Sequence, residues 1–437
     1  MENKNTRSRI YLCLAHMSEA GIEQKYIQEA FDTNWVVPLG PNVNGFEKDL
    51  EDFVNSTVET RHGTSLQQTE PLQKRVVALA SGTSAVHLAL IACGVGPGDE
   101  VLVQSFTFCA SSHPITYLGA TPVFVDSEKD SWNMDPELLE EAIKDRIAKT
   151  GKKPKAIVPV ALYGMPYDTD RIMEVANRYE IPVIEDAAEG FGSRWKGQVL
   201  GTFGEYGVLS FNGNKMITTS GGGALVCPDA DSWQRIMWYA TQAREAYPYY
   251  QHEAIGYNYR ISNICAGIGR GQMTVLDDHI AHHKHVQKYY EEAFANVPGI
   301  TVHGNPDDRY DSNFWLCTIV LDEQLKVKGQ ELAYGAAVQG AVGGAAGVVH
   351  AGGTLHTDCE PNTNVEAMRV WLDGKGIEAR PLWKPMHKQP VYKNAPAYVN
   401  GVSEALFKVG MCLPSGPMVT DDDLAYIVES IKEAIVR

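Results

Sequence analysis

Residues 181–226 read IPVIEDAAEGFGSRWKGQVLGTFGEYGVLSFNGNKMITTSGGGALV and contain two short apolar runs that each lead into polar residues. The first run, Val183-Ile184, ends on Glu185-Asp186, and the second, residues 208–211, leads into Asn212-Gly213-Asn214-Lys215. Short apolar runs bounded by glycines are typical of buried parallel strands. The polar residues at their ends would then lie at the carboxyl edge of a sheet, where α/β proteins bind ligands.

Lys215 is the candidate that this arrangement favours most. A lone lysine in a loop is usually a solvated surface residue, because its charge prefers water. Here it lies between a strand and the small-residue run 218–223, which lets backbone pass close to a ligand. A lysine in a crowded site can lose its proton and act as an amine nucleophile. Lys215 together with Asp186, which could hold a protonated ring nitrogen, is the pair that a pyridoxal phosphate (PLP) enzyme needs.

The chain on either side of this stretch alternates between strand-like and helix-like segments. Strands are predicted at residues 76–80, 100–104, 121–126 and 156–164, and helices at residues 85–94, 136–149 and 170–179. This alternation predicts a parallel sheet with helices on both faces. A long helix is predicted over residues 261–294, and a last helix begins after Thr420, whose three following aspartates suit a helix start.

A small polar turn, Ser81-Gly82-Thr83-Ser84, joins the first predicted strand to its helix. Free N–H groups at a helix start, with hydroxyls from Thr83 and Ser84, can hold a phosphate group. The same pattern also suits an ordinary helix cap, and the turn alone does not decide between the two. The presence of Lys215 favours the phosphate interpretation.

Composition limits the class of protein. The chain has 437 residues with a net charge of −16, which argues against general nucleic-acid binding. Its eight cysteines show no CxxC pairing, so we expect reduced thiols and a cytoplasmic location. No apolar run approaches membrane-spanning length, so we expect no membrane partner. Four histidines between residues 279 and 285 are irregularly spaced on a charged helix, and we expect them to be solvated and to bind no metal.

Six motifs then occur in the order in which one family carries them: WVVPLGPNVNGFE, SGTSAVHLAL, IEDAAE, SFNGNK, GYNYRISN and ARPLWKPMH. On these motifs the chain resembles the DegT/DnrJ/EryC1/StrS family of PLP-dependent sugar aminotransferases. The resemblance covers nearly the whole chain. It implies the type I PLP fold of aspartate aminotransferase, with a mostly parallel sheet in a large domain and a smaller C-terminal α/β domain. The N-terminal turn at residues 35–41 would lie at the mouth of the active site.

The resemblance also implies a set of site residues. Lys215 would hold PLP and move protons as general base and acid, and Asp186 would hold the ring nitrogen. Phe108 would stack on the ring, and Glu189 would lie near the phenolic oxygen of the cofactor, in a protonation state that the sequence leaves open. The phosphate would be bound by Thr83, Ser84 and Ser210, and by Asn258 of the neighbouring subunit, which implies a homodimer with shared active sites. Weaker candidates for the substrate diphosphate or uracil are Arg260, Arg380, Lys384 and His387.

The predicted domain boundaries follow from the same comparison. Residues 1–30 form an arm and a first helix, residues 31–275 the large PLP-binding domain, and residues 276–437 the small domain. Residues 326–362, rich in Gly and Ala, are an apparent insertion into that small domain, and residues 56–74 are a polar surface excursion.

Within the family, the likeness is greatest to enzymes that aminate C4 of UDP-4-keto-6-deoxy-N-acetylglucosamine on the route to bacillosamine. The signals are SFNGNKMITTSGGG, Glu189, and RPLWKPMH followed by CLPSG. The expected reaction is a pair of half-transaminations with L-glutamate as amino donor. The alternatives are a GDP-perosamine-type 4-aminotransferase, a PLP sugar dehydratase of the same fold, and a non-enzymatic PLP-binding regulator. A dehydratase of the known kind carries His in place of the lysine, whereas this chain carries Lys215.

Overall fold

The structure is a computed structural model and describes residues 7–56, 73–332 and 359–436. The polar excursion predicted at residues 56–74 and the Gly/Ala-rich insertion predicted at residues 326–362 lie mostly outside these ranges, so both stay predictions. Among the described helices, none has the length and apolar character that crossing a membrane requires.

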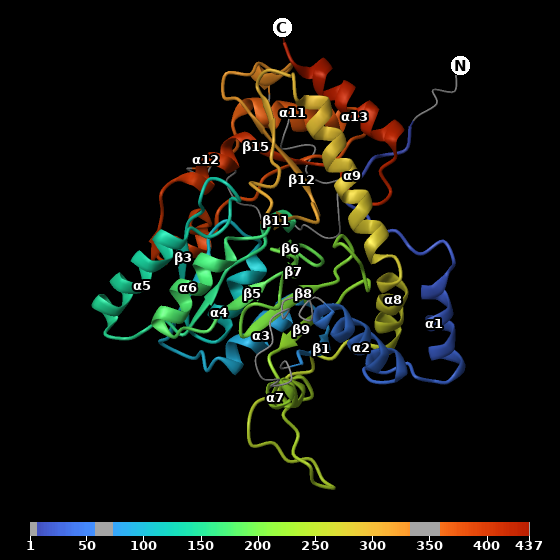
Figure 1. Ribbon diagram of the computed structural model, residues 1–437, viewed down its shortest axis with the longest axis vertical. Helices are drawn as coiled ribbons and strands as arrows, with labels where there is room; N and C mark the ends of the chain where they lie inside the picture. Colours follow the sequence, from blue (N-terminus) through green and yellow to red (C-terminus); the bar gives the residue numbers. More distant parts are fainter. Residues whose placement is uncertain (1–6, 57–72, 333–358, 437) are drawn as a thin grey trace, which may run out of the picture.

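A central sheet organises the lower part of the molecule in Figure 1. Its strands are β1 (Arg75–Leu79), β2 (Glu100–Gln104), β3 (Thr121–Val125), β4 (Ala156–Val158), β5 (Ile184–Asp186), β8 (Tyr206–Ser210), β9 (Gly223–Cys227) and β14 (Ala397–Tyr398). These strands form two groups, in the orders β1-β9-β8-β5 and β14-β3-β2-β4. Two parallel bridges, Ile157 with Val183 and Val160 with Asp186, join the groups beside β4 and β5. Among the strands that the structure describes in this sheet, β9 alone runs against its neighbours. The predicted α/β fold with a mostly parallel sheet is confirmed.

Helices cover both faces of this sheet, because its strands are apolar on both sides. On β2, Val101 and Val103 pack in one cluster with α3 (Gly82–Ala92), α4 (His113–Tyr117) and α7 (Ala230–Ala240). Leu102 points to the other face and packs with α5 (Pro136–Thr150) and α6 (Thr169–Tyr179). The alternation along one strand therefore explains the two helical layers.

A second sheet lies at the top of Figure 1 and is antiparallel throughout, in the order β10-β12-β15-β13. Its strands are β10 (Ile300–Val302), β12 (Cys317–Leu321), β13 (Arg380–Pro381) and β15 (Gly410–Leu413). The helices beside it are α9 (Leu276–Phe294), α11 (Thr363–Gly374), α12 (Val402–Val409) and α13 (Asp421–Ala434). The predicted start of α13 is confirmed, since Thr420 and Asp423 form a capping box there. The domain boundaries themselves stay predictions.

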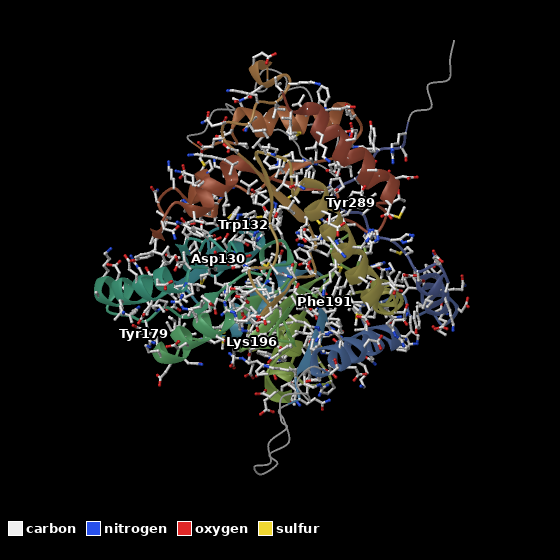
Figure 2. The ribbon with its side chains drawn as sticks, turned by 45° about the horizontal axis from the view of Figure 1, so that its top comes forward. Asp130, Trp132, Tyr179, Phe191, Lys196 and Tyr289 are labelled. Atoms are coloured by element: carbon white, nitrogen blue, oxygen red, sulfur yellow. The ribbon has the colours of Figure 1, made fainter. Side chains whose placement is uncertain are left out.

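Other described helices and strands lie outside these two sheets, and three of the strands form a third sheet in the order β11-β6-β7. These elements are α1 (Ile22–Asp32), α2 (Pro41–Asn55), α8 (Asn263–Met273), and the short strands β6 (Arg194–Trp195), β7 (Gln198–Val199) and β11 (Tyr310–Asp311). Beneath the end of β8, Phe191 packs edge-on against Phe211 with ring centroids 5.6 Å apart, and Figure 2 shows Phe191 in the interior. The N-terminal segment crosses the upper sheet, where Ile10 pairs with Ile377 and Leu12 accepts a bond from Ser415.

The single long helix predicted over residues 261–294 is wrong, because the structure divides it into α8 and α9. The break falls at Thr274-Val275, where the Thr274 hydroxyl donates to the Gly271 carbonyl and Asp277 and Asp278 begin a new helix. β-Branched residues are poor helix formers, and aspartates suit a first turn.

The prediction that the histidines of this helix are solvated is wrong for two of them. His279 and His283 are buried, and each uses Nδ1 to bond a backbone carbonyl, of Met216 at 3.2 Å and of Phe314 at 3.0 Å. They occupy the face of α9 that packs on the rest of the protein. Burial lowers the pKa of both imidazoles, which favours their neutral form.

Glu185 has a structural role next to the residues of the site. Its carboxylate is buried and accepts bonds from the backbone N–H groups of Gly201, Phe203 and Gly204, so it holds the turn that leads into β8. Burial raises the pKa of Glu185, and these three bonds oppose that effect.

We expect Glu185→Ala to destabilise the protein by about 2–4 kcal/mol, because two buried N–H groups and a partly buried one lose their acceptor. Glu185→Gln keeps one carbonyl oxygen and should lose less. Thermal unfolding of both variants measures the difference. Equal melting temperatures for wild type and Glu185→Ala would show that water replaces the carboxylate without cost.

Candidate active site

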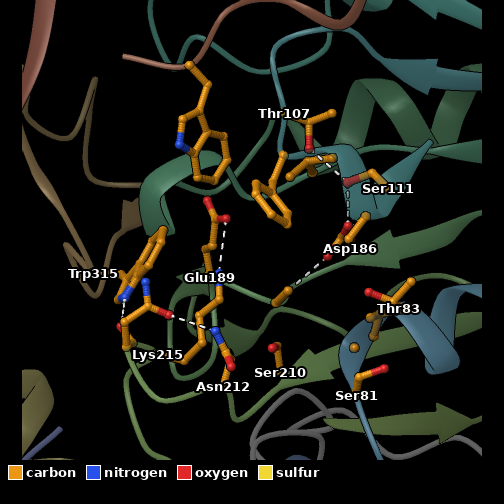
Figure 3. Close-up of a pocket in the computed structure, with 18 of the residues that line it drawn as sticks. Ser81, Thr83, Thr107, Ser111, Asp186, Glu189, Ser210, Asn212, Lys215 and Trp315 are labelled. Carbon is orange, nitrogen blue, oxygen red and sulfur yellow. Dashed lines mark hydrogen bonds and ion pairs between the residues drawn. The ribbon is translucent and has the colours of Figure 1, made fainter. Parts of the chain in front are cut away.

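A cavity of about 470 Å³ opens at the carboxyl ends of β5 and β8, where the sequence predicts a ligand site. Asp186 is the last residue of β5 and Ser210 the last residue of β8. The cavity is also lined by Thr83, Phe108, Glu189 and Lys215, and Figure 3 shows these elements converging on it. Its volume lies within the range of small-molecule and cofactor sites.

Lys215 lies between a carboxylate and an aromatic ring. Its Nζ is 3.2 Å from Glu189 Oε1 and 3.9 Å from the centre of the Trp315 ring, and 12% of its side chain is exposed. The indole N–H of Trp315 donates to the Asn214 carbonyl at 2.6 Å, which orients the ring beside the lysine. An ion pair and a cation–π contact thus hold one amine in place.

Glu189 is buried and has both oxygens engaged. Oε1 pairs with Lys215, and Oε2 accepts the backbone N–H of Tyr163 at 2.7 Å. Tyr163 has a positive φ of 56°, which is uncommon for a bulky residue and marks a constrained position. Burial raises the pKa of Glu189, and the Lys215 ammonium acts against that rise.

Asp186 is the second buried carboxylate of the site. Its Oδ2 accepts the Ser111 hydroxyl at 2.6 Å, and its Oδ1 accepts the Ala188 N–H at 3.2 Å. Burial raises the pKa of Asp186, whereas these two bonds and Lys215 lower it. The donors at the carboxylate therefore favour its charged form.

The start of α3 forms a polar corner of the cavity. Ser81 is the N-cap, and its Oγ accepts the Ser84 N–H at 3.0 Å. Thr83 and Ser210 line the cavity here, whereas the buried Ser84 bonds the Ser81 hydroxyl and is not among the lining residues. Gly82 allows a close approach, since a Cβ there would lie 3.1 Å from Ser210 Cβ. A helix N-terminus with hydroxyls beside it is a site for an anion.

Aromatic side chains form the opposite wall. The Trp383 ring centre lies 5.6 Å from that of Phe108 and 5.0 Å from that of Tyr163. Phe108 is 54% exposed, so it is not a core residue, and it lines the cavity; its stacking on the cofactor ring stays a prediction. The backbone N–H of Trp383 also donates to the Tyr163 hydroxyl at 2.8 Å.

The four substrate candidates differ in position. Arg380 lines the cavity, where its guanidinium is held by Glu378. Arg260 lies outside the cavity, where its guanidinium forms an ion pair with Glu47 and donates to the Ala78 carbonyl. His387 bonds the Ser105 hydroxyl at 2.7 Å, and neither it nor Lys384 is a lining residue. Of the four, Arg380 is the one that lines this cavity, and substrate roles for the other three stay predictions.

Asn258 does not line the cavity of its own chain. It is exposed and belongs to the segment between α7 and α8. Its backbone pairs there in an antiparallel bridge with Thr241, the residue that follows α7. No residue of the turn at residues 35–41 lines the cavity either, although Trp35 and Leu39 are exposed.

Several lining residues were not predicted as site residues from the sequence: Leu12, Ser81, Ser111, Asn212, Trp315 and Trp383. Trp383 lies inside the ARPLWKPMH motif and Ser111 follows Phe108 by three residues, so local signals existed for these two. Leu12 and Trp315 reach the site through long-range packing, which no local pattern reports.

The donor set fits PLP. A buried carboxylate suits a protonated ring nitrogen, the polar corner at α3 suits a phosphate group, and Lys215 supplies an amine between them. An exposed aromatic ring, that of Phe108, can cover the face of a pyridine. The cavity thus carries complementary groups for the ring nitrogen, the phosphate and the aldehyde of the cofactor.

Comparisons with known proteins agree with this fit. The sequence model of the DegT/DnrJ/EryC1/StrS aminotransferase family matches residues 18–343 and 346–432. EpsN of Bacillus subtilis (strain 168), named provisionally as a pyridoxal phosphate-dependent aminotransferase, is 41% identical over 426 residues, which are 96% of this chain and 94% of EpsN. GDP-perosamine synthase of Escherichia coli O157:H7 is 33% identical over 423 residues, 97% of this chain and 98% of its own.

Solved structures show the same fold. A DegT DnrJ EryC1 StrS aminotransferase from Brucella abortus superimposes with a TM-score of 0.77 at 26% identity, over 95% of each chain. The PLP form of Spr1654 from Streptococcus pneumoniae has a TM-score of 0.77 at 23% identity, over 98% of each chain, and at that identity it speaks for the fold alone.

Proposed function

The chain belongs to the DegT/DnrJ/EryC1/StrS aminotransferase family and is a PLP-dependent sugar aminotransferase, and from this premise we propose that it transfers an amino group from L-glutamate to C4 of a nucleotide-linked 4-keto-6-deoxy sugar. The preferred substrate is UDP-4-keto-6-deoxy-N-acetylglucosamine. The observation that carries the proposal is the placement of Lys215 between Glu189 and Trp315 in a cavity that also holds Asp186 and the polar corner at α3.

The residues of the site have separate tasks in this proposal. Asp186 holds the ring nitrogen of PLP, Thr83 and Ser210 hold the phosphate, and Phe108 covers the ring. Bound PLP supplies an electron sink for the carbon that loses a proton. Lys215 carries PLP in the resting enzyme and, once displaced, moves that proton as general base and then as general acid.

Glu189 and Trp315 support the displaced lysine. Because Lys215 contacts both in the structure, its amine can stay beside the reacting carbon after it is released. Holding a catalytic group within reach of the proton it transfers is a main requirement of general base catalysis.

The lining favours a sugar with an apolar edge. In a 4-keto-6-deoxy sugar the C6 methyl lies two bonds from C4, so it must lie close to the amine that reacts there. Apart from Glu189, the Trp315 ring lies against Lys215, and the Trp383 ring centre is 6.3 Å from that of Trp315. A methyl group gains from contact with such surfaces, whereas a hydroxyl would need a partner. Arg380 is available for the negative charge of the nucleotide diphosphate.

The UDP-linked sugar is preferred because the motifs SFNGNKMITTSGGG and RPLWKPMH, together with Glu189, resemble those of the bacillosamine-type enzymes. A second candidate is a GDP-linked sugar, because GDP-perosamine synthase of E. coli O157:H7 is 33% identical to this chain along nearly its whole length. Both candidates share the same chemistry at C4 and differ in the base.

A panel of UDP- and GDP-linked 4-keto-6-deoxy sugars, each with L-glutamate, tests the assignment. We expect the highest kcat/KM for UDP-4-keto-6-deoxy-N-acetylglucosamine. A higher kcat/KM for the GDP-linked sugar would show that the enzyme is of the GDP-perosamine type. If neither sugar is aminated, the proposed substrate class is wrong.

We also propose a homodimer with shared active sites, in which Asn258 reaches the PLP phosphate of the partner. Asn258 is exposed and lies outside the cavity of its own chain, so a role in binding the PLP phosphate would place it at the cavity of the partner subunit. The connection that carries Asn258 also exposes Tyr249, Tyr250 and Ile255, and exposed apolar groups of this kind favour a protein interface.

Complementation tests the shared site. Lys215→Ala and Asn258→Ala subunits, each inactive or nearly so alone, should form mixed dimers in which one site has both residues intact. Random exchange would then recover up to about a quarter of wild-type activity, because half of the dimers are mixed and half of their sites are intact. The assay should run at limiting PLP, since losing one phosphate hydrogen bond costs about 1.5–3 kcal/mol. Activity that never exceeds that of Asn258→Ala, with exchange verified, would contradict the shared site.

A further inference from the structure

Two buried hydroxyl groups lead in series to Asp186. The Ser111 Oγ lies 2.6 Å from Asp186 Oδ2, and the Thr107 Oγ1 lies 2.8 Å from the Ser111 Oγ. Both side chains belong to residues that are 1% exposed. Figure 3 shows the chain of contacts from Thr107 through Ser111 to Asp186.

The chemistry of the groups fixes the direction of both bonds. An ionised carboxylate only accepts hydrogen bonds, so the single Ser111 hydrogen points to Asp186. The Ser111 oxygen is then free to accept, and Thr107 donates to it. Both hydroxyl dipoles therefore point their positive ends toward the carboxylate, and hydrogen bonds arranged in series strengthen one another.

Asp186 needs such support because burial disfavours its charged form. The bond from Ser111 is the largest of the effects that oppose burial and lower the pKa of this carboxyl group, ahead of the Ala188 N–H and Lys215. The other oxygen, Oδ1, accepts the longer bond of 3.2 Å from the Ala188 N–H.

We propose that Ser111, with Thr107 behind it, is a positioning residue that keeps Asp186 ionised and directed at the ring nitrogen of PLP. The proposal rests on the proposed function, in which Asp186 holds that nitrogen. Ser111 and Thr107 would then both belong to the PLP site without having to contact the cofactor themselves.

The local backbone explains why these residues meet at this point. After β2 the chain turns at Ser105, whose carbonyl accepts the Thr107 N–H at 3.0 Å. A short 3₁₀ turn, Cys109–Ser111, follows, and the Ser111 N–H bonds the Phe108 carbonyl. The turn that exposes the Phe108 ring to the cavity thus also brings Ser111 against Asp186.

The test compares the affinity of the cofactor-free protein for PLP and for 1-deazapyridoxal phosphate, which has carbon in place of the ring nitrogen. Ser111→Ala should weaken PLP binding about tenfold, because a hydrogen bond to a charged group is lost. It should change the affinity for the deaza analogue by less than about twofold, since that ring offers Asp186 no N–H to bind. Quenching of protein fluorescence on titration gives both dissociation constants.

Matched variants separate positioning from packing. Ser112→Ala removes an equally buried hydroxyl at the end of the same turn, where it donates to the Cys109 carbonyl, and should change neither affinity. Thr107→Val removes the outer hydroxyl with little change of shape and should weaken PLP alone by about threefold. Thr107→Ser keeps the hydroxyl and should restore wild-type binding. The Thr107 pair keeps the test decisive if Ser111→Ala does not fold.

Two outcomes would overturn the proposal. An equal loss of affinity for PLP and for the deaza analogue would mean that Ser111 acts only through packing, and no loss for either would mean that Asp186 does not depend on it. Asp186→Asn, measured in parallel, separates this proposal from the proposed function. If Asp186→Asn discriminates between the two cofactors and Ser111→Ala does not, only the positioning role fails. If Asp186→Asn does not discriminate either, the assignment of Asp186 to the ring nitrogen fails with it.

Discussion

Lys215→Ala is expected to abolish turnover, lowering kcat by at least about a thousandfold, while the protein stays folded. The amine is lost both as the group that carries PLP and as the base that moves the proton, and general base catalysis alone contributes about 10²–10⁴-fold. The fold should survive because the lysine projects into a cavity. Its loss does leave the buried Glu189 without its cation.

Lys215→Arg is the matched control for that charge. It retains a cation for Glu189 and Trp315 but cannot form the covalent link, so it should be as inactive as Lys215→Ala and closer to wild type in melting temperature. Lys25→Ala, at an exposed position on α1, should match wild type in both measurements. Borohydride reduction of the wild-type holoenzyme followed by peptide mass mapping should place the pyridoxyl group on Lys215. A label on another lysine, or turnover by Lys215→Ala above about one per cent of wild type, would contradict the assignment.

Asp186→Asn is expected to bind PLP but to react with glutamate about a hundredfold to a thousandfold more slowly. The amide has nearly the shape of the carboxylate and can still accept the Ser111 hydroxyl, but it cannot stabilise a protonated ring nitrogen. Removing a group that stabilises developing charge in a dry site has effects of about this size. Single-turnover absorbance changes of the holoenzyme with glutamate measure the rate.

The control for Asp186→Asn is Glu185→Gln. Glu185 is the adjacent residue and is equally buried, but its carboxylate holds the turn at residues 201–204 and does not line the cavity. This variant should react at nearly the wild-type rate. A near-normal rate for Asp186→Asn would reject its role at the ring nitrogen.

Much of the fold was predictable because its signals are local. Most strands of the central sheet are short, buried apolar runs, and Asp186 and Ser210, the last residues of β5 and β8, lie at one sheet edge. The break between α8 and α9 was missed because a β-branched pair is only weakly unfavourable in a helix, whereas packing decides where the helix bends.

The site was predictable where it depends on sheet edges and family motifs, and not where it depends on long-range contacts. Asp186, Glu189 and Lys215 come from one stretch of sequence and do lie in one cavity. Arg260 was chosen for its charge, yet that charge is engaged by Glu47, more than 200 residues away in the chain. Trp315 was overlooked for the converse reason, since its contact with Lys215 joins elements that are distant in sequence.

One measurement tests the central claim that this site stores an amino group and delivers it to a sugar. The holoenzyme is treated with ¹⁵N-glutamate, freed of all amino acid by gel filtration, and then mixed with UDP-4-keto-6-deoxy-N-acetylglucosamine. Mass spectrometry should find one ¹⁵N-amino sugar formed per subunit, with none from Lys215→Ala. Absence of ¹⁵N from the sugar, or its incorporation only while glutamate is present, would contradict the account.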